Sequence, residues 1–159
     1  MKRRWFAYIV VGVLFGVFDF YFLNFIPKWA TNSIVLSQII GILLTFGVWL
    51  VPSLPIVLYE TKISRSRMLS ALANVLTWSI AVIVYYVTNV VQLAIGGLNQ
   101  PWMSFSHHKS LGFWSNWSNL LATYIWGHIL EWSVVAVVGG FIIGFLISSI
   151  YLVVRMDQK

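Results

Sequence analysis

The chain has 159 residues, of which 60% are hydrophobic and only 9% are charged. This composition excludes an ordinary water-soluble domain, because such domains are about 25% charged and a small domain leaves much of its surface exposed. The net charge is +6, but the basic residues lie in short clusters between apolar runs, which indicates the lipid bilayer and its anionic headgroups as partners and not nucleic acid.

Four apolar segments are long enough to cross a bilayer, since a spanning helix needs about 20 mostly apolar residues. They cover residues 5–26, 34–59, 68–95 and 132–154. The first follows a basic start, as in a signal peptide, but the bulky sequence DFYFLNF offers no small-residue cleavage site, so we expect this helix to be retained. We predict an all-α integral membrane protein, a single membrane domain over residues 1–159 with four transmembrane helices.

The chain between the third and fourth spans, residues 96–131, is predicted to form an outer loop and a surface helix. The apolar region from Leu120 to Val154 would reach about 52 Å at about 1.5 Å per residue, which exceeds a hydrocarbon core of about 30 Å. Polar and apolar side chains separate onto two sides over residues 114–130, a pattern typical of an interfacial amphipathic helix. We expect this extracytoplasmic helix to end in a bend before the span that begins at Trp132.

The basic residues predict the orientation of the chain. Of the ten Lys and Arg residues, only Lys28 and Lys109 fall on the far side of a four-span topology. By the positive-inside rule, this bias predicts a multi-pass protein of the plasma membrane with both termini in the cytoplasm. The residues that share the cytoplasmic side are Lys2, Arg3, Arg4, Lys62, Arg65, Arg67, Arg155 and Lys159.

Small residues recur every four positions on the first and fourth spans. The first span has Gly12 and Gly16, and the fourth has Ala136, Gly140 and Gly144. Small residues at this spacing let helix backbones approach closely, so we interpret both stripes as helix-packing faces. A third stripe, of polar and aromatic residues on the third span, is expected to face protein and not lipid; it comprises Asn74, Trp78, Ala81, Tyr85, Thr88 and Gln92.

An aspartate, Asp19, stands inside the first span, where a carboxylate costs about 2.5 to 3.5 kcal/mol on insertion scales. The glycine stripe turns it toward the bundle, and no Lys or Arg lies at its depth in the predicted threading. Either its carboxyl group is protonated and donates a hydrogen bond, or a cation occupies the space beside it. We hypothesise an outward-opening acidic cavity, with a hydrogen-bonded structural cluster as the alternative. The residues expected to line it are Asp19, Gln38, Asn89, Gln92 and Glu131.

Metal binding and catalysis have less support in the sequence. His128 and Glu131 stand at i and i+3, which can place two metal ligands on one helical face, and His107 and His108 could add ligands from the loop. A second Glu-x-x-His element is missing, and the chain has no cysteine. No nucleophile elbow, phosphate-binding glycine loop or dinucleotide fingerprint is present. No cofactor is identified, and enzymatic activity is not predicted.

Two functions fit these features. A small polytopic protein with short cytoplasmic ends and many aromatic residues fits a non-enzymatic accessory or anchoring subunit of a membrane complex, which would bind a membrane-protein partner or assemble with copies of itself. The alternative is a small-solute or cation binding or transport module that uses the acidic cavity.

Overall fold

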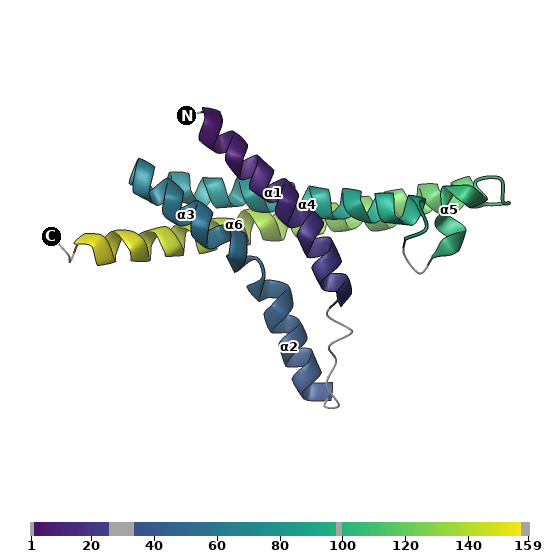
Figure 1. Cartoon of the computed structure of the whole chain (residues 1–159), viewed down its shortest axis with the longest axis horizontal. Coiled ribbons are helices and arrows are strands. Elements are labelled where there is room, and N and C mark those ends of the chain that lie inside the picture. The colour runs from purple at the N-terminus through teal and green to yellow at the C-terminus, as the bar shows by residue number, and fades with distance from the viewer. Residues whose placement is uncertain (1, 26–33, 98–99, 157–159) are drawn as a thin grey trace.

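The computed structural model describes residues 2–25, 34–97 and 100–156 (Figure 1). Within these ranges the regular structure is helical and no strand occurs. Four helical stretches are long and apolar enough to cross a membrane. These observations confirm the prediction of an all-α chain with four helices of spanning length. The stretches are Arg3–Leu23, Gln38–Ser64, Arg67–Ala94 and Phe113–Arg155.

The long helix α4, Arg67–Ala94, is the centre of the fold (Figure 1). Helix α6, Trp126–Met156, lies along it, and helix α1, Lys2–Phe25, crosses it. Helix α4 begins at a proper N-cap, because the Ser66 hydroxyl accepts a hydrogen bond from the Leu69 N–H at 3.3 Å and so satisfies one of the free donors of the first turn.

Both small-residue stripes lie against α4. A Cβ atom added to Gly12 or Gly16 would lie only 2.7 or 2.5 Å from a carbonyl oxygen of α4, and one added to Gly144 would lie 2.8 Å from a Cα atom of that helix. Ala136 and Gly140 are buried on the same face of α6. The glycines therefore set how closely α1 and α6 approach the central helix.

The second span is bent, whereas the sequence analysis treated residues 34–59 as one helix. Helix α2, Ile34–Gly47, is followed by a break at residues 48–49 and then by helix α3, Leu50–Ser64. Helix α3 packs against α4 and α6. Helix α2 swings away from these helices (Figure 1).

Proline explains the position of this break. Pro52 has no N–H group, so the carbonyl of Val48 cannot form the usual helical hydrogen bond with it. The Val48 carbonyl instead accepts a tighter hydrogen bond from the Val51 N–H at 3.0 Å. Pro52 then lies in the first turn of α3, where a missing N–H is tolerated. The kink thus lies at residues 48–49, on the N-terminal side of Pro52.

The connection from α4 to α6 contains several short helices. Two 3-10 helices, Pro101–Met103 (η2) and Phe105–His107 (η3), precede helix α5, Phe113–Asn119. A π-helical segment, Leu120–Ile125 (η4), then joins α5 to α6. The expected bend near Trp132 is therefore absent, and the irregularity lies earlier, in the π-helical segment.

Residues that precede Trp132 also pack against α4. The indole N–H of Trp117 donates to the Met103 carbonyl at 2.9 Å. Trp117 and Met103 form a small apolar core with Phe113 of α5 and Leu93 of α4. Ile125 packs in the main core. Contacts with α4 thus extend well beyond the part of α6 that begins at Trp132, while a position at the bilayer surface remains a prediction.

The start of α1, the end of α6 and the junction between α3 and α4 lie toward the same end of the molecule (Figure 1). Arg3, Lys62 and Arg155 are exposed there. Four spanning-length stretches that run alternately back and forth bring these segments together, which is compatible with the charge pattern, while the side of the membrane remains a prediction. We call this the basic end of the molecule.

Candidate functional site

A cavity of about 100 Å³ lies where all four apolar stretches meet. Asp19 of α1 and Thr45 of α2 contribute polar side chains to its lining. Most of its wall is aromatic, because two tryptophans and two tyrosines surround it, together with two aliphatic residues. The other lining residues are Leu23, Trp49, Val82, Tyr85, Tyr86 and Trp132.

Asp19 is the most unusual group in this lining. It is only 3% exposed, yet its Oδ1 atom has no hydrogen-bond partner among the residues that the structure describes. It lies one turn beyond Gly16, whose contact with α4 turns this face of α1 inward. A buried polar atom without a partner is costly in an apolar medium, so this oxygen has unused capacity to accept a hydrogen bond or to face a positive charge.

The aromatic walls are held in place by further ring contacts. Trp49 packs edge-to-face on Phe15 at 5.3 Å and on Trp78 at 4.9 Å between ring centroids. Tyr85 makes a similar contact with Phe20 at 5.5 Å. The break between α2 and α3 places Trp49 at the cavity, between two helices. These contacts fix the rings in preferred edge-to-face geometries, so the cavity is largely preformed.

Of the five residues predicted to line an acidic cavity, Asp19 alone lines this one. Gln92 donates from Nε2 to the Tyr21 hydroxyl at 2.6 Å, and Asn89 lines a separate pocket near the end of α4. Gln38 is exposed on α2. The side chain of Glu131 is 67% exposed. Helix rotation explains the difference, because residues at one depth can still point in different directions around their helices.

The predicted metal ligands likewise have other contacts. His128 Nδ1 lies 3.1 Å from Glu131 Oε2, so these two side chains do share one face. His107 Nδ1 lies 3.0 Å from the Ser106 hydroxyl, and His108 bonds to a backbone carbonyl. Within the described parts of the chain, no group of three His, Asp or Glu side chains could hold a metal ion.

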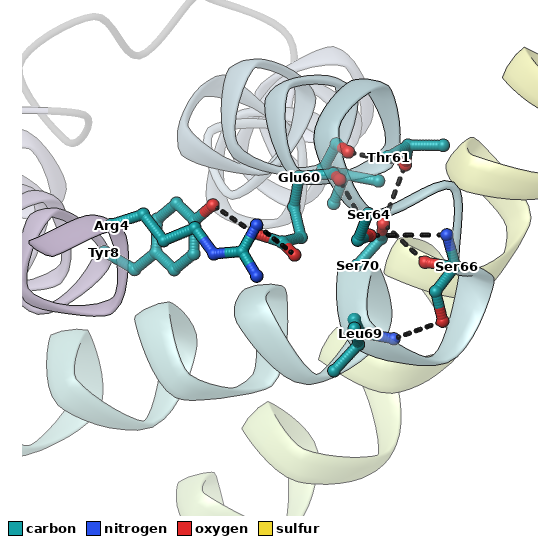
Figure 2. A network of polar contacts seen from close by, with 9 residues as sticks. Arg4, Tyr8, Glu60, Thr61, Ser64, Ser66, Leu69 and Ser70 are labelled. Atoms are coloured by element: carbon teal, nitrogen blue, oxygen red, sulfur yellow. Dashed lines mark hydrogen bonds and ion pairs between the residues drawn. The ribbon is translucent and has the colours of Figure 1, made fainter. Parts of the chain in front are cut away.

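A second buried carboxyl group, Glu60 of α3, lies near the basic end and was not identified by the sequence analysis. It is fully buried, at 0% exposure. Its Oε2 atom accepts a hydrogen bond from the Tyr8 hydroxyl at 2.6 Å, and its Oε1 atom lies 3.4 Å from Arg4 Nη1 (Figure 2). The predicted span ended at Tyr59, one residue before Glu60. Arg4 and Tyr8 are four residues apart and so share one face of α1. This spacing was the one sequence signal that a buried acidic partner could lie against that face.

Short side chains extend this polar region toward the start of α4. The Thr61 hydroxyl lies 2.8 Å from the Ser70 hydroxyl, and Ser70 also donates to the Ser66 carbonyl at 2.9 Å (Figure 2). The Ser64 hydroxyl donates to the Glu60 carbonyl at 2.8 Å. The contact between Thr61 and Ser70 joins the end of α3 to the start of α4, and the other two bonds are local to one helix end each. The network therefore stabilises the turn between the two helices.

The geometry around Asp19 limits what the cavity could hold. A Ca²⁺ ion takes six to eight oxygen ligands, and the described lining supplies only a carboxyl group and a few hydroxyl groups. Aromatic rings, in contrast, attract organic cations through their negative faces. The combination of one acidic oxygen and four rings therefore suits a small organic cation better than a bare metal ion.

Comparisons with protein-family models, curated proteins and solved structures find no match to this chain.

Proposed function

We propose that this protein binds a small organic cation in the aromatic cavity beside Asp19. The observation that carries the proposal is the unpaired Oδ1 atom of a 97%-buried carboxyl group at a cavity with four aromatic rings, since Asp19 is 3% exposed. An ammonium group there would supply the missing partner of the carboxylate. Its alkyl groups would contact the rings through cation–π attraction, which strengthens when the cation is removed from water.

The cavity volume favours a small ligand. An apolar cavity of about 150 Å³ is large enough to bind benzene, so about 100 Å³ suits a methylated ammonium ion. Water molecules alone could occupy the same space and bond to Asp19. The two cases differ in their response to added amines, because only a ligand site gains stability with amine concentration.

Thermal unfolding of the purified protein in detergent tests this proposal. Methylammonium and tetramethylammonium should raise the melting temperature in a saturable way, because a ligand at 100 times its Kd adds about 2.7 kcal/mol to the free energy of unfolding. tert-Butanol, which is similar in size to tetramethylammonium but neutral, should not. Asp19→Asn should abolish the shift, and the matched control Glu131→Gln, at an exposed carboxyl group, should keep it.

Two results would overturn the proposal. One is a protein whose melting temperature responds to none of these ammonium ions. The other is an equal shift in the wild type and in Asp19→Asn, which would mean that the amines act elsewhere.

A second candidate function, an accessory or anchoring subunit of a membrane complex, is favoured by helix α2. This helix swings away from α1, α4 and α6 (Figure 1), and exposed apolar side chains lie along its described part, residues 38–47. A partner helix could pack on it. Photo-crosslinkers at Ile42 and Leu43, which are 59% and 65% exposed, should capture one stoichiometric protein in native membranes. Capture of lipid alone would count against this function. The exposed apolar side chains in the described part of α2 are those of Ile39, Ile42, Leu43 and Phe46.

A further inference from the structure

A groove of about 610 Å³ runs between α1 and α3 at the basic end, separate from the Asp19 cavity. Its outer part is lined by Arg3, Arg4 and Tyr59. Its deeper part is apolar, with Val11 and Ile56 among the lining residues. The groove therefore changes from polar to apolar along α1, from the basic end toward the middle of the candidate span.

The two arginines of this groove are not equivalent. Arg4 is held in the wall by Glu60, with 3.4 Å between Nη1 and Oε1, and its side chain is 17% exposed. Its Nε atom is buried and has no hydrogen-bond partner among the described residues. Arg3 is exposed, and no acidic side chain of the described chain forms an ion pair with it. The groove thus offers the positive charge of Arg3, which has no ion-pair partner among the described residues, beside the partly exposed guanidinium of Arg4.

We propose that this groove binds an anionic phospholipid of the membrane leaflet at the basic end. The phosphate lies against Arg3 and Arg4, where basic groups at a membrane interface attract anionic headgroups. An acyl chain lies over Val11 and Ile56. The tyrosine at position 59 is 53% exposed, and its ring contributes to the wall at headgroup level, where tyrosine is enriched in membrane proteins.

The dimensions of the groove agree with one leaflet. From Arg3 to Val11 the helical rise amounts to about 12 Å at about 1.5 Å per residue. One leaflet of the hydrocarbon core is about 15 Å deep, half of a core of about 30 Å. An acyl chain can therefore follow the groove for most of the leaflet while its phosphate reaches the arginines.

A lipid fits this groove better than a soluble phosphate compound. The deeper wall is apolar and lies within the candidate spans Arg3–Leu23 and Gln38–Ser64, so a ligand without a tail would leave it to solvent or to other lipids. The free charge of Arg3 favours an anionic headgroup over a zwitterionic one, because a zwitterionic headgroup has its own cation close to the phosphate. The salt bridge to Glu60 keeps Arg4 from turning away into solvent.

Native mass spectrometry of the full-length protein, titrated with phosphatidylglycerol or phosphatidylcholine of equal chain length, tests this assignment. Phosphatidylglycerol should bind more tightly. Arg3→Gln should weaken its binding about five-fold, since one basic residue near the surface contributes about 1 kcal/mol. Arg155→Gln is the matched control, because it removes a basic residue of the same end outside the groove and should leave the affinity unchanged.

A second variant tests the acyl-chain part of the site. Ala7 lines the groove and is exposed, so Ala7→Trp should fill the groove without disturbing the core, and bound phosphatidylglycerol should be lost. Glycerol 3-phosphate, which lacks the tails, should not compete. The assignment is overturned by equal affinity for both lipids, by equal effects of the two arginine variants, by lipid retention in Ala7→Trp, or by competition from glycerol 3-phosphate.

Discussion

The two buried carboxyl groups of this protein are chemically alike but have opposite surroundings. Asp19 and Glu60 are 3% and 0% exposed. Glu60 Oε2 accepts a hydrogen bond from a tyrosine hydroxyl at 2.6 Å, and Glu60 Oε1, although it has no hydrogen bond, lies 3.4 Å from an arginine nitrogen in an ion pair. The Oδ1 atom of Asp19 has neither a hydrogen bond nor an ion pair in the described chain and lies at a cavity. Along α1, Arg4 and Asp19 are about 22 Å apart at helical rise, so the two sites are independent.

This difference distinguishes a carboxyl group with a structural role from one that could belong to a binding site. A buried charge with a good partner is already compensated, and removing that partner is what destabilises the protein. A buried carboxyl group with an unused oxygen beside a cavity is compensated only when something else enters. Burial alone would therefore mark both residues as functional, and only the partners distinguish them.

The largest expected effect is the loss of Glu60. Glu60→Gln leaves Arg4, which is only 17% exposed, without its counter-charge, and should lower the free energy of unfolding by about 3 kcal/mol. Asp19→Asn should leave it unchanged or raise it, since an amide costs less than a carboxylate in an apolar site. Denaturation in mixed micelles measures both, and the comparison fails if Asp19→Asn is the more damaging variant.

A smaller effect is expected at the contact that turns Asp19 inward. Gly16→Ala places a Cβ atom 2.5 Å from the Ala81 carbonyl oxygen, so α1 must shift, at a cost of about 2 kcal/mol. In the same micelles, Gly41→Ala is the control, because nothing lies within 4 Å of its Cβ position. Equal unfolding free energies for the two variants would show that this close approach does not matter for stability.

The smallest effect is expected at Gln92, a residue that the sequence analysis grouped with Asp19. Its bond to the Tyr21 hydroxyl, at 2.6 Å, is at the exposed surface. Gln92→Leu should lower the unfolding free energy by about 0.6 kcal/mol, the average for hydrogen bonds between membrane helices, and should leave amine-induced stabilisation intact. Loss of that stabilisation would place Gln92 in the cation site and contradict the separation of Gln92 from Asp19.

Most of the helical layout could be predicted from the sequence, because it depends on local quantities. The length of an apolar run sets whether it can span a bilayer, and residues four apart share a helix face. The four spanning stretches follow from the first rule. The position of Gly12, Gly16 and Gly144 against α4 follows from the second. Pro52 is likewise a local signal for the break at residues 48–49, because proline removes a helical hydrogen bond, although the sequence analysis gave the second span as one helix.

The partners of each buried polar group were decided only by the tertiary structure. The meeting of Arg4 and Tyr8 with Glu60, and of Asp19 with Trp49 and other rings, depends on how the helices cross and rotate. Depth along the membrane can be counted from sequence, but direction around each helix relative to its neighbours cannot. The chain alone therefore determined that a carboxyl group would be buried at position 19. Packing determined that it would face aromatic rings and, among the described residues of the cavity, no amide or second acid.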